Sequence, residues 1–377
     1  MTDRLLDRVA DGLSLALTIG VALVAGAVII WLTSADPGHA LRAFFLGPFQ
    51  NKLFFGNMLQ TAAPLLLTGL GVAVAFQVGA VNLGAEGQVY AGALAGATLL
   101  LFPPFVSPWL IPVAVVAAGL AGALFAWLAG WLRTRFGATE VIGSFLIGAA
   151  LIQLFDFFLR RYLADPTAGF PTSKPLAATF RLARLLPPSN LNVMFAIGIV
   201  LAVVAFFVLY RTTFGYRIRL TGLSVKYARY SGIRVGWHFL VAMAISGALA
   251  GIAGVGEVMG VQGRLVTGLS NNLGWNGVTV ALVARLHPLG VIPAALLYGY
   301  LHSGATVAGL MSDVSPRIAS IIQSLIFYMI TAQAIYVWLR RRLGAARANA
   351  GPGGALPSGA TGRPRRQGGP SAARSDR

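Results

Sequence analysis

The sequence predicts an all-α polytopic membrane protein, and three observations lead to that fold class. The chain of 377 residues is 56% hydrophobic and only 11% charged, which is more apolar than a soluble core requires. Its apolar residues fall into successive runs near the length of one bilayer crossing, roughly 20 helical residues. A six-residue segment also occurs twice, once in each half of the chain.

Ten apolar runs are candidate transmembrane helices. The third begins with polar residues and the eighth is shorter than a bilayer is thick, so we expect both to be broken or re-entrant helices inside the protein. We assign residues 1–339 to the transmembrane domain and 340–377 to a basic, Pro/Gly-rich, disordered tail. The ten runs cover residues 13–33, 58–76, 83–102, 109–131, 140–159, 191–210, 237–257, 272–284, 288–306 and 317–339.

The net charge of +18 is concentrated in connections and in the tail, which holds nine arginines. Because Lys and Arg in short connections favour the cytoplasm, the basic segments 133–137 and 211–236 and the tail predict that both termini are cytoplasmic. We expect the tail to lie on anionic membrane lipid and not to bind nucleic acid. The segment 160–190 is then external, and its stretch FRLARLL (180–186) reads as an amphipathic surface helix, an external gate or a docking patch.

The sequence lacks the motifs that several kinds of functional site require. The chain has no cysteine, and its four histidines are scattered without a metal-ligand spacing, so we expect no metal site and no cofactor. No phosphate-binding G-x-x-x-x-G-K-[ST] segment is present, so we expect the chain not to be an enzyme that hydrolyses ATP. The predicted spans also lack the chain of Asp, Glu and His side chains that a proton-driven carrier uses. An external energy source or passive flow is implied.

The repeated segment reads NLGAEG at 82–87 and NLGWNG at 272–277. By the predicted topology the apolar run after the first copy heads outward and the run after the second heads inward. Duplicated halves of opposite orientation build many transporters, with broken helices meeting near the middle of the membrane. The repeat therefore predicts an internal inverted repeat.

Each copy offers polar side chains at the start of a helix. Asn82 and Asn272 suit the N-cap position, and Glu86 and Asn276 follow one turn later on the same helix face. Glu86 is either a structural anion at a helix end or part of a polar solute path, and in both cases it should face the protein interior. Glu257 is a second candidate polar contact. The candidate path residues are Asn82, Glu86, Gln88, Asn272, Trp275 and Asn276.

The segment 211–236 has six Lys or Arg residues and no acidic residue. Its glycines punctuate a short helical pattern with exposed aromatic and aliphatic residues, which indicates a docking helix between glycine hinges. We expect Ala228→Glu and Gly232→Asp to uncouple a partner without disturbing folding. The residues assigned to this coupling loop are Gly215, Arg219, Gly222, Tyr227, Ala228 and Gly232.

Four pieces of the chain then carry a resemblance: FQVGAVNLGAEGQVYAGALAGA, FGYRIRLTGLSVKYARYSGI, AISGALAGIAGVGEVMG and GWNGVTVALVARLHPLGVIPAALLYG. Over residues 55–335 the sequence resembles the membrane-spanning permease subunits of bacterial ABC importers for nucleosides and simple sugars. The resemblance implies that residues 216–234 insert into an ATPase subunit that binds ATP and Mg²⁺. It also implies a second permease, identical or homologous, and an extracytoplasmic solute-binding protein or lipoprotein. The permease itself is then expected in the bacterial inner membrane.

The segment NLGAEGQ, with its Glu and Gln, looks nearer to the nucleoside branch of that family than to the sugar branch. A permease for simple sugars or branched-chain amino acids is the alternative within the class. From other classes, a passive channel or ion-driven carrier would need no ATPase, and a membrane scaffold would not transport at all. The acid-poor spans argue against the carrier, and the repeated helix interruption argues against the scaffold.

Overall fold

The computed structural model describes residues 2–315, 317–318, 320–322, 324–325 and 328–329. The part of the chain it describes contains α-helices, short 3₁₀ and π turns and three isolated β-bridges, without a strand. The predicted all-α class is confirmed. The predicted tenth span, 317–339, lies mostly outside the described residues, as do the boundary predicted at residue 339 and the tail 340–377.

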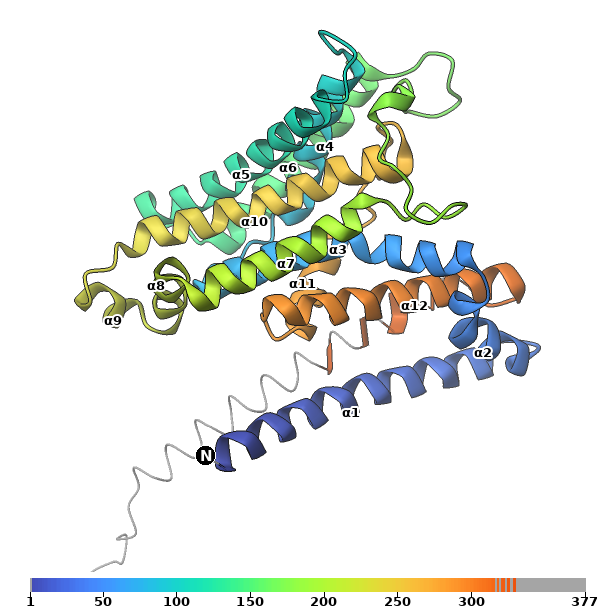
Figure 1. Cartoon of the computed structure of the whole chain (residues 1–377), viewed down its shortest axis with the longest axis horizontal. Helices are drawn as coiled ribbons and strands as arrows, with labels where there is room; N and C mark the ends of the chain where they lie inside the picture. Colours follow the sequence, from blue (N-terminus) through green and yellow to red (C-terminus); the bar gives the residue numbers. More distant parts are fainter. Residues whose placement is uncertain (1, 316, 319, 323, 326–327, 330–377) are drawn as a thin grey trace, which may run out of the picture. The chain divides into compact units, whose positions relative to one another are not determined.

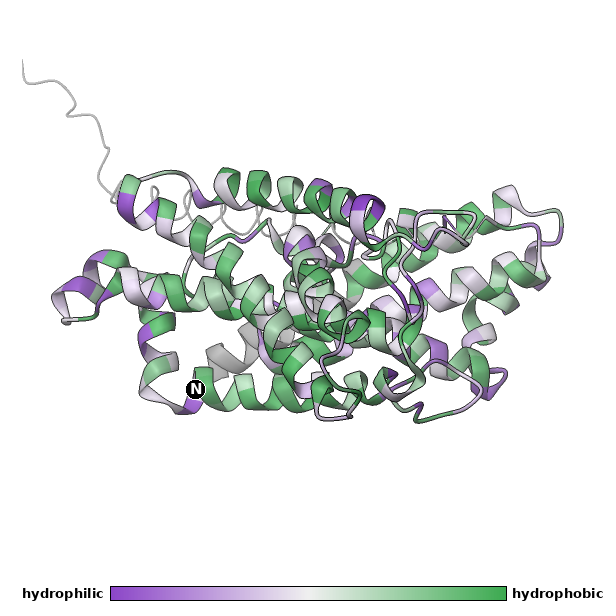
Figure 2. Cartoon of the chain, turned by 90° about the horizontal axis from the view of Figure 1, so that it is seen from above, coloured by the Kyte–Doolittle hydropathy of each residue, from purple (hydrophilic) through white to green (hydrophobic). Residues whose placement is uncertain are grey.

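The long helices follow the predicted spans closely (Figure 1). Six of the described helical segments are long and apolar enough to cross a membrane, while Leu273–Val283 is a shorter apolar helix. Their residues are predominantly hydrophobic along their length (Figure 2). The helices are α1 (Thr2–Thr33), α2 (Pro37–Leu46), α3 (Lys52–Gln77), α4 (Ala85–Leu101), α5 (Leu110–Phe136), α6 (Glu140–Phe158), α7 (Val193–Arg211), α8 (Thr213–Leu223), α9 (Val225–Tyr230), α10 (Val235–Glu257), α11 (Leu273–Val283) and α12 (Val291–Met311).

Local sequence explains where several of these helices begin and end. The side chains of Asn51 and Asn192 accept hydrogen bonds from the backbone at the starts of α3 and α7, which satisfies donors that have no partner within a helix. α5 ends at Gly137, whose φ of +71° is a left-handed conformation that glycine adopts without a steric penalty. Arg133 near the end of α5 pairs with Glu140 at the start of α6.

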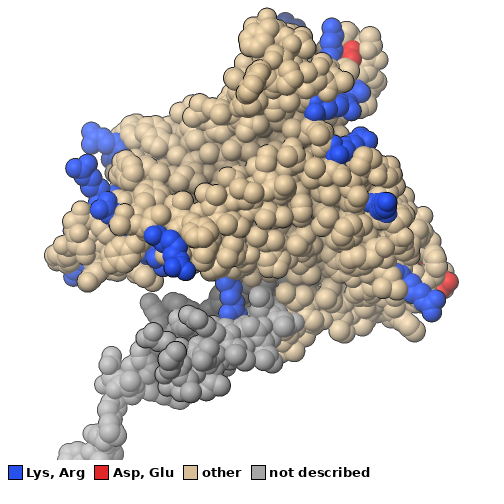
Figure 3. All heavy atoms as spheres, viewed as in Figure 1, with Lys and Arg blue, Asp and Glu red and all other residues tan. Residues whose placement is uncertain are grey.

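The centre of the bundle is formed by α10, which packs on α3, α4 and α5. The α5 and α10 backbones come so close at Gly122 and Gly247 that a Cβ on either residue would overlap the other helix. One apolar core lies among α4, α5 and α10, and another lies among α2, α3, α11 and α12. On the face seen in Figure 3 most Lys and Arg side chains gather toward the ends of these helices, which leaves a wide uncharged band between them.

The segment 160–190 corrects one interpretation of the sequence. It contains a π turn at Leu159–Leu163 and a 3₁₀ turn at Ala178–Phe180, and residues 181–186 are irregular, so the amphipathic-helix interpretation of 180–186 is wrong. The segment is held instead by backbone hydrogen bonds to the stretch after α10, from Leu176 N to Gly263 O at 2.8 Å and from Leu182 N to Met259 O at 3.1 Å.

Candidate functional site

The first motif copy, residues 82–87, forms the turn before α4 and is buried. The Asn82 amide donates to Gln88 Oε1 at 2.8 Å and to Ser246 Oγ at 3.0 Å, and its Oδ1 accepts from Gly84 N and Gln88 Nε2. The N-cap residue of α4 is Gly84, so the prediction that Asn82 occupies this position is wrong. Asn82 instead braces the turn from two residues earlier and ties it to α10.

Glu86 lies in the first turn of α4, but its carboxylate serves a different helix. Its Oε2 accepts a hydrogen bond from the backbone N–H of Gly274 at 2.7 Å. The Ser270 hydroxyl and the backbone N–H groups of Asn272 and Trp275 are further hydrogen-bonding neighbours. The carboxylate is buried within the protein, as predicted, and it satisfies the unpaired donors at the start of α11.

The second motif copy, residues 272–277, starts α11 with an unusual backbone. Asn271 and Asn272 have φ values of +45° and +67°, a left-handed conformation in which Asn is tolerated more readily than most residues. Asn272 occupies the predicted N-cap position of α11, but its side chain makes no capping hydrogen bond. The predicted capping by Asn272 is therefore wrong, because Glu86 on α4 takes over that role.

The two motif copies thus meet, with the start of α11 against the start of α4. Gly274 makes this possible, because a Cβ at that position would overlap the backbone nitrogen of Glu86. From the meeting point α4 runs toward the segment 160–190, where Leu100 and Phe180 belong to the same apolar core. α11 runs the other way, to a turn that touches the end of α3 (Figure 1). These opposite directions match the inverted arrangement predicted from the repeat.

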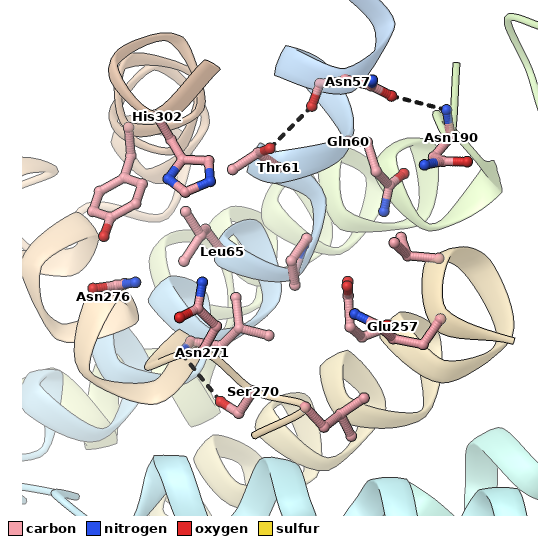
Figure 4. A pocket seen from close by; sticks show the side chains of 16 residues that line it. Asn57, Gln60, Thr61, Leu65, Asn190, Glu257, Ser270, Asn271, Asn276 and His302 are labelled. Atoms are coloured by element: carbon pink, nitrogen blue, oxygen red, sulfur yellow. Dashed lines mark hydrogen bonds between the residues drawn. The ribbon is translucent and has the colours of Figure 1, made fainter. Parts of the chain in front are cut away.

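Two cavities open beside this meeting point. The first has a volume of about 240 Å³ and the second about 580 Å³. Figure 4 shows the first cavity, into which side chains from α3, α10, α11 and α12 and from the stretch before α11 project. Its polar lining consists of Asn57, Gln60, Thr61, Asn190, Glu257, Gln262, Ser270, Asn271, Asn276, Tyr298 and His302.

The candidate path residues divide between these surroundings. Asn276 lines both cavities, Asn272 and Trp275 line the second, and Glu257 lines the first. Asn82, Glu86 and Gln88 line neither and are held in hydrogen bonds within the protein. Their assignment to a solute path stays a prediction.

Sequence reasoning missed most of the first cavity. Asn57, Gln60 and His302 are polar residues inside apolar helices, and such residues usually face the interior of a membrane protein. It is the same signal that singles out Glu86 and Glu257 in the sequence. Asn190 and Asn271 lie in connections and carry no comparable signal. Within the described residues no group of three or more His, Asp or Glu side chains could hold a metal ion.

The predicted coupling loop forms two short helices that break at Ser224, whose side chain caps α9 by accepting from Tyr227 N at 3.3 Å. The prediction that Gly222 is a hinge is wrong. Gly222 lies within α8, where a Cβ would overlap the carbonyl oxygen of Gln77. Gly232 does turn the chain after α9, with φ of +75°. Gly215 also starts α8 in close contact with α7.

Exposure separates the side chains of α9 and the end of α8. Leu223, Tyr227 and Tyr230 are exposed, which leaves an apolar and aromatic surface among basic residues. Ala228 is fully buried, so the expectation that Ala228→Glu leaves folding undisturbed is wrong, because the carboxylate would have to enter packed protein. The role of this surface in docking stays a prediction.

A chain of contacts joins α8 to the far end of α11. The Arg219 guanidinium lies 4.6 Å from the centre of the Tyr210 ring on α7. The Tyr210 hydroxyl is 3.4 Å from Gln77 Nε2, which also donates to Leu286 O at 2.9 Å in the turn after α11. Arg285 and Leu286 in that turn have φ values of +51° and +60°, which cost free energy for residues with a Cβ.

Comparison with known proteins places these features in a family. Residues 54–331 match the family described as "Branched-chain amino acid transport system / permease component". The glucose ABC transporter permease protein of Haloferax volcanii is 30% identical over 328 residues, covering 84% of this chain and 86% of that protein. The nucleoside ABC transporter permease protein of Lactococcus lactis subsp. cremoris is 30% identical, covering 85% and 90%. The guanosine ABC transporter permease protein of Bacillus subtilis is 28% identical, covering 84% and 92%.

Proposed function

Because the chain belongs to the family of branched-chain amino acid transport system permease components, we propose that it is the permease subunit of an ATP-driven importer whose solute is a nucleoside. The observation that carries this proposal is the pair of polar cavities beside the point where the interrupted helices α4 and α11 meet. Interrupted helices expose backbone and side-chain polar groups inside the membrane, and proteins use that arrangement to pass polar solutes.

The lining of the cavities supports an uncharged solute. Among the described residues neither lining includes Lys or Arg, so these residues do not offer the cation that would pair with the carboxylate of a free amino acid. Amide side chains from Asn and Gln present donors and acceptors together, which suits the base and the hydroxyl groups of a nucleoside. The nucleoside and guanosine permeases among the relatives favour the same solute class. A simple sugar is the second candidate, supported by the glucose permease relative.

In this proposal the energy comes from ATPase subunits that dock on α8 and α9. The exposed Leu223, Tyr227 and Tyr230 provide apolar contact area, and the neighbouring basic residues provide charge. The complete importer contains two permeases, two ATPases and an external solute-binding protein or lipoprotein, in the inner membrane with both termini of this chain in the cytoplasm. ATP and Mg²⁺ bind to the ATPase partners and not to this chain.

Purification from the native membrane tests the proposal. The tagged chain is extracted in mild detergent and the proteins retained with it are identified by mass spectrometry. We expect an ATPase in stoichiometric amount from the unaltered chain and much less from Tyr227→Ala. Tyr162→Ala, an exposed tyrosine in the segment after α6, is the matched control and should retain the ATPase. A chain that purifies alone, yet catalyses solute flux in liposomes, would show a carrier or channel instead.

Uptake competition then identifies the solute class. Cells that express the complete importer take up labelled guanosine in the presence of unlabelled adenosine, uridine, glucose or leucine. We expect the nucleosides to compete and leucine to have no effect. Competition by glucose alone would replace the nucleoside with a simple sugar and leave the permease role intact.

A further inference from the structure

Four polar side chains lie at the boundary between the two cavities. Asn271, Asn276, Tyr298 and His302 line both the first and the second cavity. They come from the left-handed turn before α11, from α11 itself and from α12. A solute that passed from one cavity to the other would therefore move between these side chains, three of which, Asn271, Asn276 and His302, are labelled around the first cavity in Figure 4.

These four side chains differ from the buried polar groups of the first motif copy, which are hydrogen-bonded within the protein. Within the described part of the chain, none of the four side chains is hydrogen-bonded to another residue. Tyr298 is only 9% exposed, yet its hydroxyl is not itself buried, and Asn271, Asn276 and His302 are only partly covered. These polar groups therefore face the cavities, where water or a ligand can supply the hydrogen bonds that the protein does not.

The surrounding residues indicate the chemistry of that ligand. The lining of the first cavity combines apolar side chains with polar side chains from α3 and α10. A hexose, which offers hydroxyl groups around its whole ring, would leave the apolar part of this lining without a matching surface. A flat heteroaromatic ring has apolar faces and a polar edge, so it fits a lining of mixed character better. The apolar lining residues are Pro64, Leu65, Val261, Leu269 and Leu273.

We propose that Asn271, Asn276, Tyr298 and His302 form a polar constriction that binds the solute in transit, with the amides reading the edge of a nucleobase. This inference rests on the proposed function, which supplies the direction of transport and the solute class. The Asn amides each offer a donor and an acceptor, so they match a base edge that carries both. Tyr298 and His302 provide rings and hydrogen-bonding groups on the α12 side.

The absence of cysteine from the chain allows a direct test. Single substitutions Asn276→Cys, Tyr298→Cys and His302→Cys are prepared in the complete importer, which is placed in lipid nanodiscs so that both faces meet the solution. Each thiol is reacted with a charged, membrane-impermeant thiosulfonate reagent, with and without guanosine. His39→Cys, at the exposed start of α2, shows that the reagent reaches the protein. Leu120→Cys, on an exposed apolar surface of α5, controls for labelling from lipid.

We expect the three constriction thiols to react and guanosine to slow their labelling about tenfold, while labelling of His39→Cys is unchanged. Protection by glucose and not by guanosine would keep the constriction and overturn the nucleobase assignment. Labelling that no solute slows, in an importer that still takes up guanosine, would overturn the constriction and leave the proposed function standing. Constriction thiols that label no faster than Leu120→Cys would show that water does not reach the boundary and would also overturn the inference.

The proposed function fails by a different measurement. If no ATPase purifies with the chain and ATP does not drive uptake, the importer assignment is wrong whatever the thiol labelling shows. Asn276→Ala gives a second readout for the constriction in the intact importer. Loss of one hydrogen bond to the solute should raise the half-saturating guanosine concentration about tenfold and leave maximal uptake nearly unchanged. An unchanged half-saturating concentration would count against the constriction.

Discussion

The two copies of the NLG motif share four of six residues but serve different purposes. In the first copy every polar side chain is committed, because Asn82 and Gln88 hydrogen-bond each other and Glu86 binds the backbone at Gly274. In the second copy Asn272 and Asn276 line cavities instead. The first copy is therefore framework, and the second presents its side chains to the solute path proposed here.

The two copies differ because a side chain of α4 caps the start of α11, whereas in the described part of the chain α11 does not cap the start of α4. The α11 start receives its hydrogen-bond acceptor from Glu86 on α4, so the side chains around Asn272 need not bend back to the α11 backbone. The turn before α4 is braced from within by Asn82, which accepts from Gly84 N, and by Ser144 of α6, which accepts from Leu83 N. One acidic residue in the first copy thus frees the amides of the second.

The largest expected effect comes from closing the space between the two copies. In Gly274→Ala the new methyl group would overlap the backbone nitrogen of Glu86 and push α4 and α11 apart. We expect a loss of about 1–3 kcal/mol of stability, with uptake abolished. Thermal unfolding of the purified protein measures the first effect. Gly143→Ala on α6, where a Cβ meets open space, is the matched control, and equal unfolding temperatures for both variants would contradict the close approach.

The next effect concerns the carboxylate between the copies. Glu86→Leu leaves the Gly274 N–H without its acceptor in a buried place, at a cost of about 1–3 kcal/mol. Glu86→Gln keeps an acceptor oxygen and should retain much of the uptake, whereas Glu86→Leu should abolish it. Uptake assays with both variants at matched membrane levels make the comparison. Equal losses would show that the negative charge itself is required, as a residue in direct contact with solute would be.

Much of this architecture could be predicted from the sequence, because apolar runs determine helices wherever water is excluded. The interruption before α4 and the short α11 were also predicted, since their polar starts and lengths are local features. The partner of Glu86 could not be predicted, because Gly274 lies 188 residues away and only the folded chain brings it near. The same reason applies to His302 and Asn57, which reach one cavity from separate helices.

A pair of side-chain truncations compares the copies directly. Asn82→Ala removes the hydrogen-bond partner of the buried Gln88 and should lower the unfolding temperature. The variant that remains folded should have an unchanged half-saturating solute concentration. Asn272→Gly removes a side chain without a capping role but keeps the left-handed conformation, so it should leave the unfolding temperature nearly unchanged while weakening solute recognition severalfold. Both quantities are measured on both variants. The same pattern in the two variants would mean that the copies are equivalent after all.

The smallest effect is expected at the other end of α11, where the second copy's helix meets α3. Gln77 holds the strained turn at Leu286 and touches Tyr210, against which Arg219 of α8 stacks. Motion of α8 would therefore reach α11 through Gln77, and α11 carries Asn276 to the cavities. We expect Gln77→Leu to preserve folding and ATPase binding but to raise the ATP hydrolysed per solute transported about fivefold, the effect of losing about 1 kcal/mol. The measurement is ATP hydrolysis and solute uptake in the same proteoliposomes. Gln50→Leu, which replaces an exposed glutamine before α3, is the control. An unchanged ratio of ATP hydrolysed to solute transported in Gln77→Leu would mean that α8 acts on α11 by another route. One such route is the direct contact of Gly222 with the end of α3.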